Sequence, residues 1–87
     1  MNYLLQGMES PDKIRCLLAL TKINSENKID GLMLHFVHGN GASSAAALSG
    51  VPQQKLAESI KALNIEAGYC ESFYEIKQRE LNTSKVV

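Results

Sequence analysis

The sequence predicts an all-α fold, a small domain of four to five helices with a central helix-turn-helix. Apolar residues recur at helical spacing along most of the chain, whereas the alternating β-branched and aromatic runs that are typical of strands are missing. The tetrapeptide Ser49-Gly50-Val51-Pro52 also separates an alanine-rich segment from a second amphipathic segment. At 87 residues, 45% of them hydrophobic, the chain is long enough for one domain with one core.

The N-terminal part predicts an arm followed by a first helix. Residues 1–9 contain apolar side chains without a clear period, and this arm either packs on its own domain, packs on a neighbour or frays. Ser10 is a typical helix N-cap, and Pro11 and Asp12 suit the first helical turn. We therefore predict a helix over 11–22 and a helical domain that covers residues 10–81.

A second helix is predicted between a polar start and a glycine-rich end. Asn24 and Ser25 suit its N-terminal cap, and Gly39 suits the left-handed position that follows many helices. The apolar stripe of this helix consists of Ile29, Leu32, Met33, Phe36 and Val37. The loop over residues 38–41 then leads directly into the helix-turn-helix.

The segment 42–63 predicts the two helices of the helix-turn-helix. Ala46 falls where these helices would touch, and a methyl group is about the largest side chain that fits there. Gly50 permits the positive φ of the turn, Val51 points inward, and Pro52 suits the first turn of the second helix. That second helix has a buried stripe of Leu56, Ile60 and Leu63.

The other side of this second helix is polar and is the candidate site. In DNA-binding proteins with a helix-turn-helix, that side meets bases and phosphates. Gln53 and Gln54 are candidates for base contacts, because a glutamine amide can pair both ways with adenine. Lys55 and Lys61 are candidates for phosphate contacts. Glu58 either accepts a hydrogen bond from cytosine or holds a neighbouring lysine in place.

Two apolar stripes continue beyond this helix-turn-helix. The first extends the buried stripe as a heptad seam through Ala67, Cys70, Tyr74, Lys77 and Leu81, and the second consists of Ile65, Tyr69, Phe73 and Ile76. Two stripes need two partners. Either all these residues close one monomer core, or the protein self-associates through the C-terminal helix or the N-terminal arm. Asn64 and Gly68 predict one kinked helix or a break near Asn64. Residues 82–87 are predicted to be a disordered tail.

Composition limits the classes of function. Residues 1–41 hold four bases and four acids, and residues 42–87 hold five of each, so one subunit should bind nucleic acid only modestly. Cys16 and Cys70 have no further ligands at metal spacing and are predicted as reduced core thiols. No apolar run has the length of a membrane span, and no signal-peptide pattern is present, which predicts a cytoplasmic protein with no membrane partner.

The sequence predicts neither catalysis nor a metal site. The serines lack a glycine elbow, and the carboxylates are scattered along helix faces that solvent would cover. His35 and His38 are three residues apart, but no acidic or thiol side chain is spaced to complete a metal site. Residues 39–41 read as a turn, because no strand precedes them and no Lys-Ser/Thr pair follows. We predict no enzyme, no cofactor and no small-molecule substrate.

Four segments together resemble the PapB family of fimbrial adhesin operon regulators. They are Gly-Met-Glu-Ser-Pro over 7–11, the leucine-rich segment 14–20, Phe-Val-His-Gly over 36–39, and Ile-Lys-Ala-Leu-Asn over 60–64. The resemblance covers residues 7–75. It implies an all-helical, nucleoid-associated bacterial transcription regulator that binds AT-rich repeats of double-stranded DNA as a dimer or larger oligomer. It also implies that Ser43 and Ser44 lie near the phosphates.

Two other functions stay open at this stage. The same fold suits a protein-interaction module that does not bind DNA, and it suits a plasmid-type transcriptional repressor. A DNA-binding protein should gather the two lysines of the candidate site with other bases, such as Lys13, Arg15 or Lys28, on one side. An interaction module should disperse these bases and expose an apolar patch instead.

Overall fold

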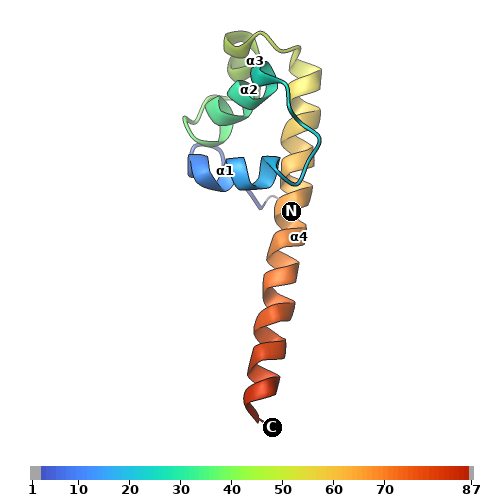
Figure 1. The fold of residues 1–87 in the computed structure, drawn as a ribbon. Helices are drawn as coiled ribbons and strands as arrows, with labels where there is room; N and C mark the ends of the chain where they lie inside the picture. Colours follow the sequence, from blue (N-terminus) through green and yellow to red (C-terminus); the bar gives the residue numbers. More distant parts are fainter. Residues whose placement is uncertain (1–2, 87) are drawn as a thin grey trace.

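The computed structural model describes the backbone of residues 3–86 and the side chains up to Leu81, and this part of the chain forms four α-helices without strands (Figure 1). The helices are α1 (Pro11–Leu18), α2 (Glu26–Phe36), α3 (Ala42–Ser49) and α4 (Gln53–Val86). The all-α fold class predicted from the sequence is therefore confirmed.

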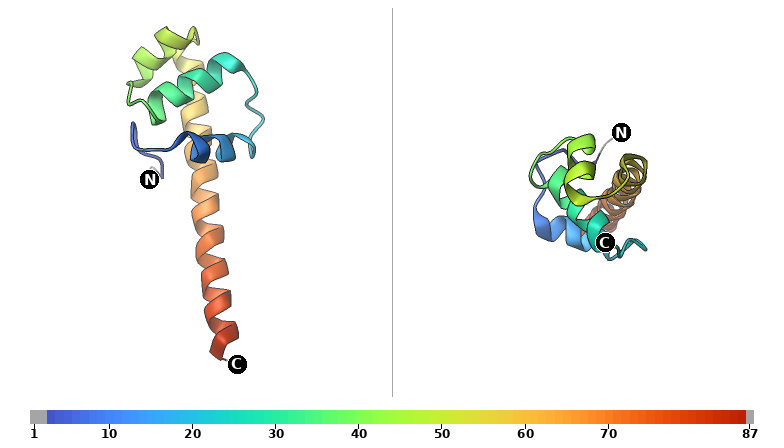
Figure 2. Two further views of the ribbon diagram at one scale, coloured as in Figure 1. Left: turned by 60° about the vertical axis from the view of Figure 1, so that its left-hand side comes forward. Right: turned by 90° about the horizontal axis from the view of Figure 1, so that it is seen from above.

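The first three helices form a body around the N-terminal half of α4, and the C-terminal half of α4 extends away from this body (Figures 1 and 2). The chain consequently measures 55 × 23 × 21 Å, and its radius of gyration of 15.3 Å exceeds the value of about 12 Å expected for a compact domain of this length. Helix α4 therefore sets the long dimension of the molecule.

The core of the body contains side chains from every helix. Its largest fully buried side chains are Ile14 of α1, Leu32 and Phe36 of α2, and Leu56 and Leu63 of α4. Helix α3 contributes two buried alanines, Ala45 and Ala46, whose small side chains let it lie close to its neighbours. Ala46 thus occupies the buried position predicted for it.

A glycine in α2 allows an equally close approach to two other helices. A Cβ atom added at Gly31 would lie 2.8 Å from Cδ1 of Leu56 and 2.9 Å from Oγ of Ser49. Both distances are shorter than a Cβ atom tolerates from another side-chain atom, so a neighbour would have to move. The side chain of Leu56 is completely buried, so it has little room to move. Gly31 therefore fixes how closely α2 packs against the helix-turn-helix.

Helix α1 is shorter than the predicted helix over 11–22. Its start agrees with the prediction, since the Ser10 side chain accepts a hydrogen bond from the backbone N–H of Lys13 at 3.2 Å. Its end at Leu18 comes earlier because Thr21 donates its hydroxyl to the Leu18 carbonyl at 2.9 Å and accepts from the N–H of Ile23 at 3.2 Å. Such local bonds compete with the helical pattern.

Helix α2 begins and ends close to the predicted positions. Of the two cap candidates, Ser25 is the N-cap, and its side chain accepts from the N–H of Lys28 at 3.5 Å. The helix ends at Phe36, and Gly39 takes the predicted left-handed conformation with φ of 83°. The chain can therefore turn back toward α3.

The N-terminal arm packs on its own domain, one of the three alternatives that the sequence left open. Leu4 is buried, and its N–H donates to Oδ1 of Asn64 at 2.9 Å. The arm also donates to the end of α2, from Gly7 N–H to the His35 carbonyl at 3.1 Å and from Glu9 N–H to the Phe36 carbonyl at 3.0 Å. Residues 1 and 2 of the predicted arm lie outside the described residues.

Helix α4 runs without the predicted break near Asn64. The Asn64 side chain donates from Nδ2 to the Ile60 carbonyl at 3.3 Å, and its Oδ1 accepts from the N–H of Leu4. The side chain therefore supports the helix rather than ending it. Gly68 makes room for the arm, because a Cβ atom there would lie 2.7 Å from Cε2 of Tyr3. Both helix-weakening residues thus serve the packing of the N-terminal arm.

Two further predictions need correction. The predicted disordered tail differs from the structure at residues 82–86, which continue α4, because no glycine or proline follows Gly68 to stop the helix; Val87 lies outside the described residues. Cys16 and Cys70 are exposed free thiols rather than core thiols. Cys16 lies beside the buried stripe of α1, and Cys70 comes one turn after Ala67, where the body ends.

Length alone does not make α4 a membrane-spanning helix. Charged residues recur along it, and within the described part of the chain we find no helix that combines the length and the apolarity needed to cross a membrane.

Candidate nucleic-acid interface

The turn between α3 and α4 comprises residues 50–52. Gly50 has φ of 76° and ψ of 21°, a left-handed conformation that glycine adopts at little cost. The N–H of Val51 donates to the Ala46 carbonyl at 3.1 Å, and the Val51 side chain is buried in the corner. Pro52 precedes the first helical residue rather than lying in the first turn, and its carbonyl accepts from Leu56 N–H at 3.0 Å. A three-residue turn therefore joins two helices that share one core.

All seven residues predicted for the candidate site are exposed, namely Ser43, Ser44, Gln53, Gln54, Lys55, Glu58 and Lys61. On α4, Gln54, Glu58 and Lys61 follow one another in steps of four and three residues, so they lie on one line along the helix. Gln53 and Lys55 lie about 100° to either side of Gln54, because each residue of an α-helix advances by that angle. The predicted polar side is thus a ridge of three residues with one residue on each flank.

The two serines lie at an N-terminus that has no side-chain cap. Gly41 is the N-cap of α3, and Ser43 and Ser44 follow it in the first exposed turn. The Ser44 hydroxyl accepts from Nδ2 of Asn40 at 3.4 Å. The first N–H groups of a helix lack intrahelical partners and carry partial positive charge, so this end of α3 suits an anionic group such as a phosphate.

The positive charges of the candidate site come from two lysines. Neither Lys55 nor Lys61 has an ion-pair partner among the described residues. The bases of α1 are already paired: Lys13 Nζ lies 2.9 Å from Oε1 of Glu9, and Arg15 lies 3.2 Å from Asp12.

The bases of α1 also lie far from the turn. Lys13 shares a cavity with Ala67 and Glu71, roughly 18 Å along α4 from Lys55, and Figures 1 and 2 show α1 and α3 at opposite ends of the body. The bases of α1 therefore do not join the candidate site.

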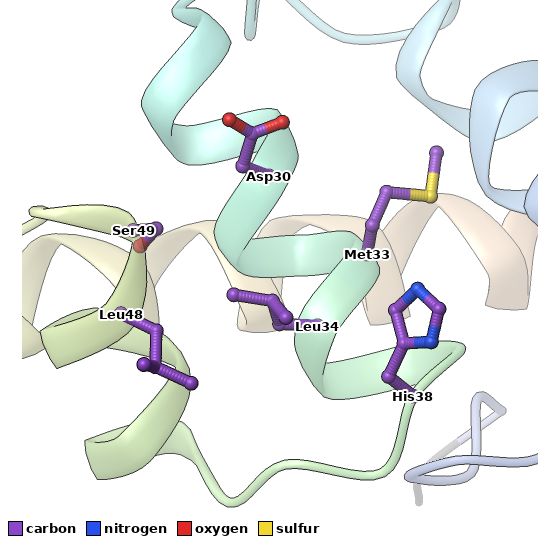
Figure 3. Close-up of a pocket in the computed structure, with 6 residues that line it drawn as sticks. All are labelled: Asp30, Met33, Leu34, His38, Leu48 and Ser49. Atoms are coloured by element: carbon purple, nitrogen blue, oxygen red, sulfur yellow. The ribbon is translucent and has the colours of Figure 1, made fainter.

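The sequence did not predict a cleft that lies between α2 and α3, the first helix of the helix-turn-helix. This cleft of about 350 Å³ is lined by Asp30, Met33, Leu34, His38, Leu48 and Ser49 (Figure 3). Leu34 of α2 and Leu48 of α3 lie in the gap between the two helices. No local pattern predicts the cleft, because its two walls come from separate helices. Its lining combines apolar side chains with a carboxylate, an imidazole and a hydroxyl.

Comparison of the chain with known proteins gives no matching family model, no matching curated protein and no matching solved structure.

Proposed function

We propose that this protein is a DNA-binding transcription regulator that docks the N-terminal part of α4 against double-stranded DNA. The observation that carries the proposal is the α3–α4 unit: a three-residue turn with left-handed Gly50, buried Ala46 and Val51 at the corner, and an exposed polar ridge on the helix that follows. This arrangement is the geometry in which helix-turn-helix proteins present a recognition helix.

Each exposed residue of the unit has a role in this proposal. Gln54 reads base edges from the N-terminal end of the ridge, with a glutamine's preference for adenine, and Gln53 lies on its flank. Lys55 contacts a phosphate from one flank of the ridge, and Lys61 contacts another from its C-terminal end. The uncapped N-terminus of α3 binds a further phosphate beside Ser43 and Ser44. Glu58 holds a lysine or accepts from a cytosine.

The small number of cations makes assembly part of the proposal. Most affinity for DNA comes from phosphate neutralisation, and two lysines per subunit supply little of it. Several subunits on adjacent sites would bind much more tightly than one, because each added contact is intramolecular. The resemblance to the PapB family also implies an oligomer. It implies a nucleoid-associated regulator of an adhesin operon that prefers AT-rich DNA.

A second candidate function is a protein-interaction module without DNA binding. The observation that favours it is the row of exposed apolar side chains on the C-terminal half of α4, where Tyr69 and Phe73 are 68% and 69% exposed. The dispersed bases of α1 also agree with this candidate.

Fluorescence anisotropy with an AT-rich and a GC-rich duplex, each at two salt concentrations, tests the proposal. We expect binding that prefers the AT-rich duplex and weakens steeply with salt. The double variant Lys55→Ala/Lys61→Ala should lower the salt slope by about two per subunit. Gln54→Ala should leave the slope unchanged and remove about 1–3 kcal/mol of sequence preference.

Lys22→Ala is the matched control, since Lys22 is an exposed lysine outside the helix-turn-helix. It should leave affinity and salt slope close to those of the natural chain. Absence of binding to both duplexes at low salt would overturn the proposal in favour of the interaction module. If Lys22→Ala and the double variant changed affinity and salt slope equally, the ridge would not be part of the DNA interface.

A further inference from the structure

The C-terminal half of α4 has an apolar side with no partner in its own chain. Tyr69, Phe73 and Tyr74 are each exposed by 60% or more. At about 100° per residue, one half of the helix surface over 65–81 carries every exposed large apolar side chain of this segment. These are Ile65, Tyr69, Phe73, Tyr74, Ile76 and Leu81, interrupted by Glu66, Lys77 and Glu80. The other half is almost entirely polar beyond Ala67.

This apolar half is large enough for a stable interface. A fully buried aromatic side chain removes about 150–250 Å² from solvent. Because Tyr69, Phe73 and Tyr74 are each exposed by 60% or more, together they expose roughly 400 Å² per chain. With Ile65, Ile76 and Leu81 from both copies, a symmetric pair would bury at most about 1,200 Å², the lower limit for specific protein interfaces.

The charges within the apolar half indicate which partner fits. Glu66 and Lys77 have almost the same angular position on α4 and are eleven residues apart, about 16 Å along the axis. They cannot pair within one chain. An antiparallel second copy would place its Lys77 beside Glu66 and its Glu66 beside Lys77. A parallel copy would bring equal charges to the same height.

A cavity between the N-terminal arm, α1 and α4 also agrees with an antiparallel second copy. It has a volume of about 170 Å³ and a mostly apolar wall formed by Tyr3, Lys13, Cys16, Leu17, Ala67, Cys70 and Glu71. In an antiparallel pair centred near Phe73, Tyr74 of the second copy lies beside Cys70, at the edge of this cavity. The second copy therefore covers apolar surface that the chain leaves open.

We propose that α4 pairs with α4 of a second copy of this chain in antiparallel orientation, with Phe73 near the two-fold axis and two reciprocal Glu66–Lys77 ion pairs. The pairing uses residues 65–81, beyond the ridge proposed for DNA. It therefore goes beyond the proposed function, and its test contains no DNA, so either can fail without the other.

Sedimentation equilibrium of the full chain tests the pairing through a charge swap. We expect the natural chain to be a dimer at micromolar concentration. Lys77→Glu and Glu66→Lys should each weaken dimerisation by about tenfold or more, because each creates equal charges in the interface. The double variant should recover most of the affinity. Glu75→Lys, on the polar half, is the control and should have no effect.

Cross-linking gives a second measurement that does not depend on reversed charges. In a background with Cys16→Ser and Cys70→Ser, Phe73→Cys should form a disulfide between copies under mild oxidation. Tyr69→Cys should cross-link to a copy with Ile76→Cys but not to itself. A chain that stays monomeric at high concentration would overturn the proposal. Failure of the double charge variant to recover affinity, or self-linking of Tyr69→Cys, would overturn the antiparallel orientation.

Discussion

Helix α4 has two halves with similar sequence patterns and opposite surroundings. In the body half, residues 53–67, Leu56 and Leu63 are fully buried and Ala67 is 4% exposed. In the free half, residues 68–81, the same seam continues through Tyr74 and Leu81, which are 60% and 47% exposed. The period does not change between the halves. A helical pattern therefore identifies side chains that can be buried, whereas burial depends on whether another element reaches them.

The halves also differ in their polar contacts. In the body half, the Ser59 hydroxyl donates to the Lys55 carbonyl at 3.1 Å, and Asn64 binds the N-terminal arm. In the free half, residues 69–81 are all exposed. The body half thus carries most of the tertiary contacts of the monomer, and the free half beyond Glu71 is a surface that solvent covers.

Leucine-to-alanine substitutions at the two ends of the seam should separate the halves most clearly. Leu63→Ala leaves a cavity in the core, and we expect the free energy of unfolding to fall by about 2–5 kcal/mol. Leu81→Ala should change it by less than about 0.5 kcal/mol. Urea unfolding at concentrations where the chain is monomeric measures both. Equal losses would show that the free half is packed in the monomer.

Glycine-to-alanine substitutions compare close packing in the body with the edge of the free half. In Gly31→Ala the new methyl group meets buried Leu56, and after the gain in helix propensity we expect a net loss of about 1–2 kcal/mol. Gly68→Ala meets only the ring of Tyr3, the end of a side chain that is 41% exposed and can therefore move aside. We expect Gly68→Ala to be neutral or stabilising by up to about 1 kcal/mol. Thermal unfolding distinguishes the two signs.

Asn64→Ala tests the connection between the arm and α4. It leaves the N–H of Leu4 without its acceptor, and we expect a loss of about 1 kcal/mol. Hydrogen exchange of the Leu4 amide should accelerate. Ser72→Ala, an exposed position in the free half, should stay within about 0.5 kcal/mol of the natural chain. Unchanged exchange at Leu4 would contradict the arm's placement.

A carboxylate of the N-terminal arm should give the smallest effect, which depends on pH. Burial alone would raise the pKa of Glu9, but hydrogen bonds from Leu5 N–H and Lys13, together with the Lys13 charge, outweigh it and lower this pKa. A lowered pKa stabilises the fold above the ordinary carboxyl range, and this contribution disappears as pH falls through the lowered value.

Glu9→Gln should therefore be less stable than the natural chain at neutral pH, and the difference should shrink in acid. Thermal unfolding at pH 7 and pH 3 measures this change. Glu75→Gln in the free half is the control, and its difference from the natural chain should stay near zero at both values. A difference at Glu9 that grows in acid would contradict the assigned contacts.

Features that depend on a few neighbouring residues were predictable. Ser10 and Ser25 cap helices because their side chains reach an N–H three residues later. Gly50 ends α3 because the turn needs positive φ. The exposure of the five candidate site residues on α4 followed from the period of the buried stripe. That same period already places Gln53 and Lys55 on opposite flanks, so the ridge could have been predicted by counting angles.

Features that depend on distant contacts were not predictable. Asn64 and Gly68 weaken an isolated helix, but in the folded chain one binds Leu4 and the other accommodates Tyr3. The exposure of Cys70 follows from where the body ends, which the helical period does not encode. The bases of α1 lie away from the turn because α1 packs against the middle of α4, near Ala67 and Glu71, rather than near its N-terminus.

The sequence alone determined the helical class, the caps, the turn and the two stripes of α4, because each results from backbone sterics and helical periodicity within a few residues. Only the tertiary structure decided that α4 is one continuous helix, that the arm packs on its own body, and that the seam is buried as far as Ala67 and exposed beyond it. The physical reason is that burial requires a second surface, and residues far away in the chain supply it.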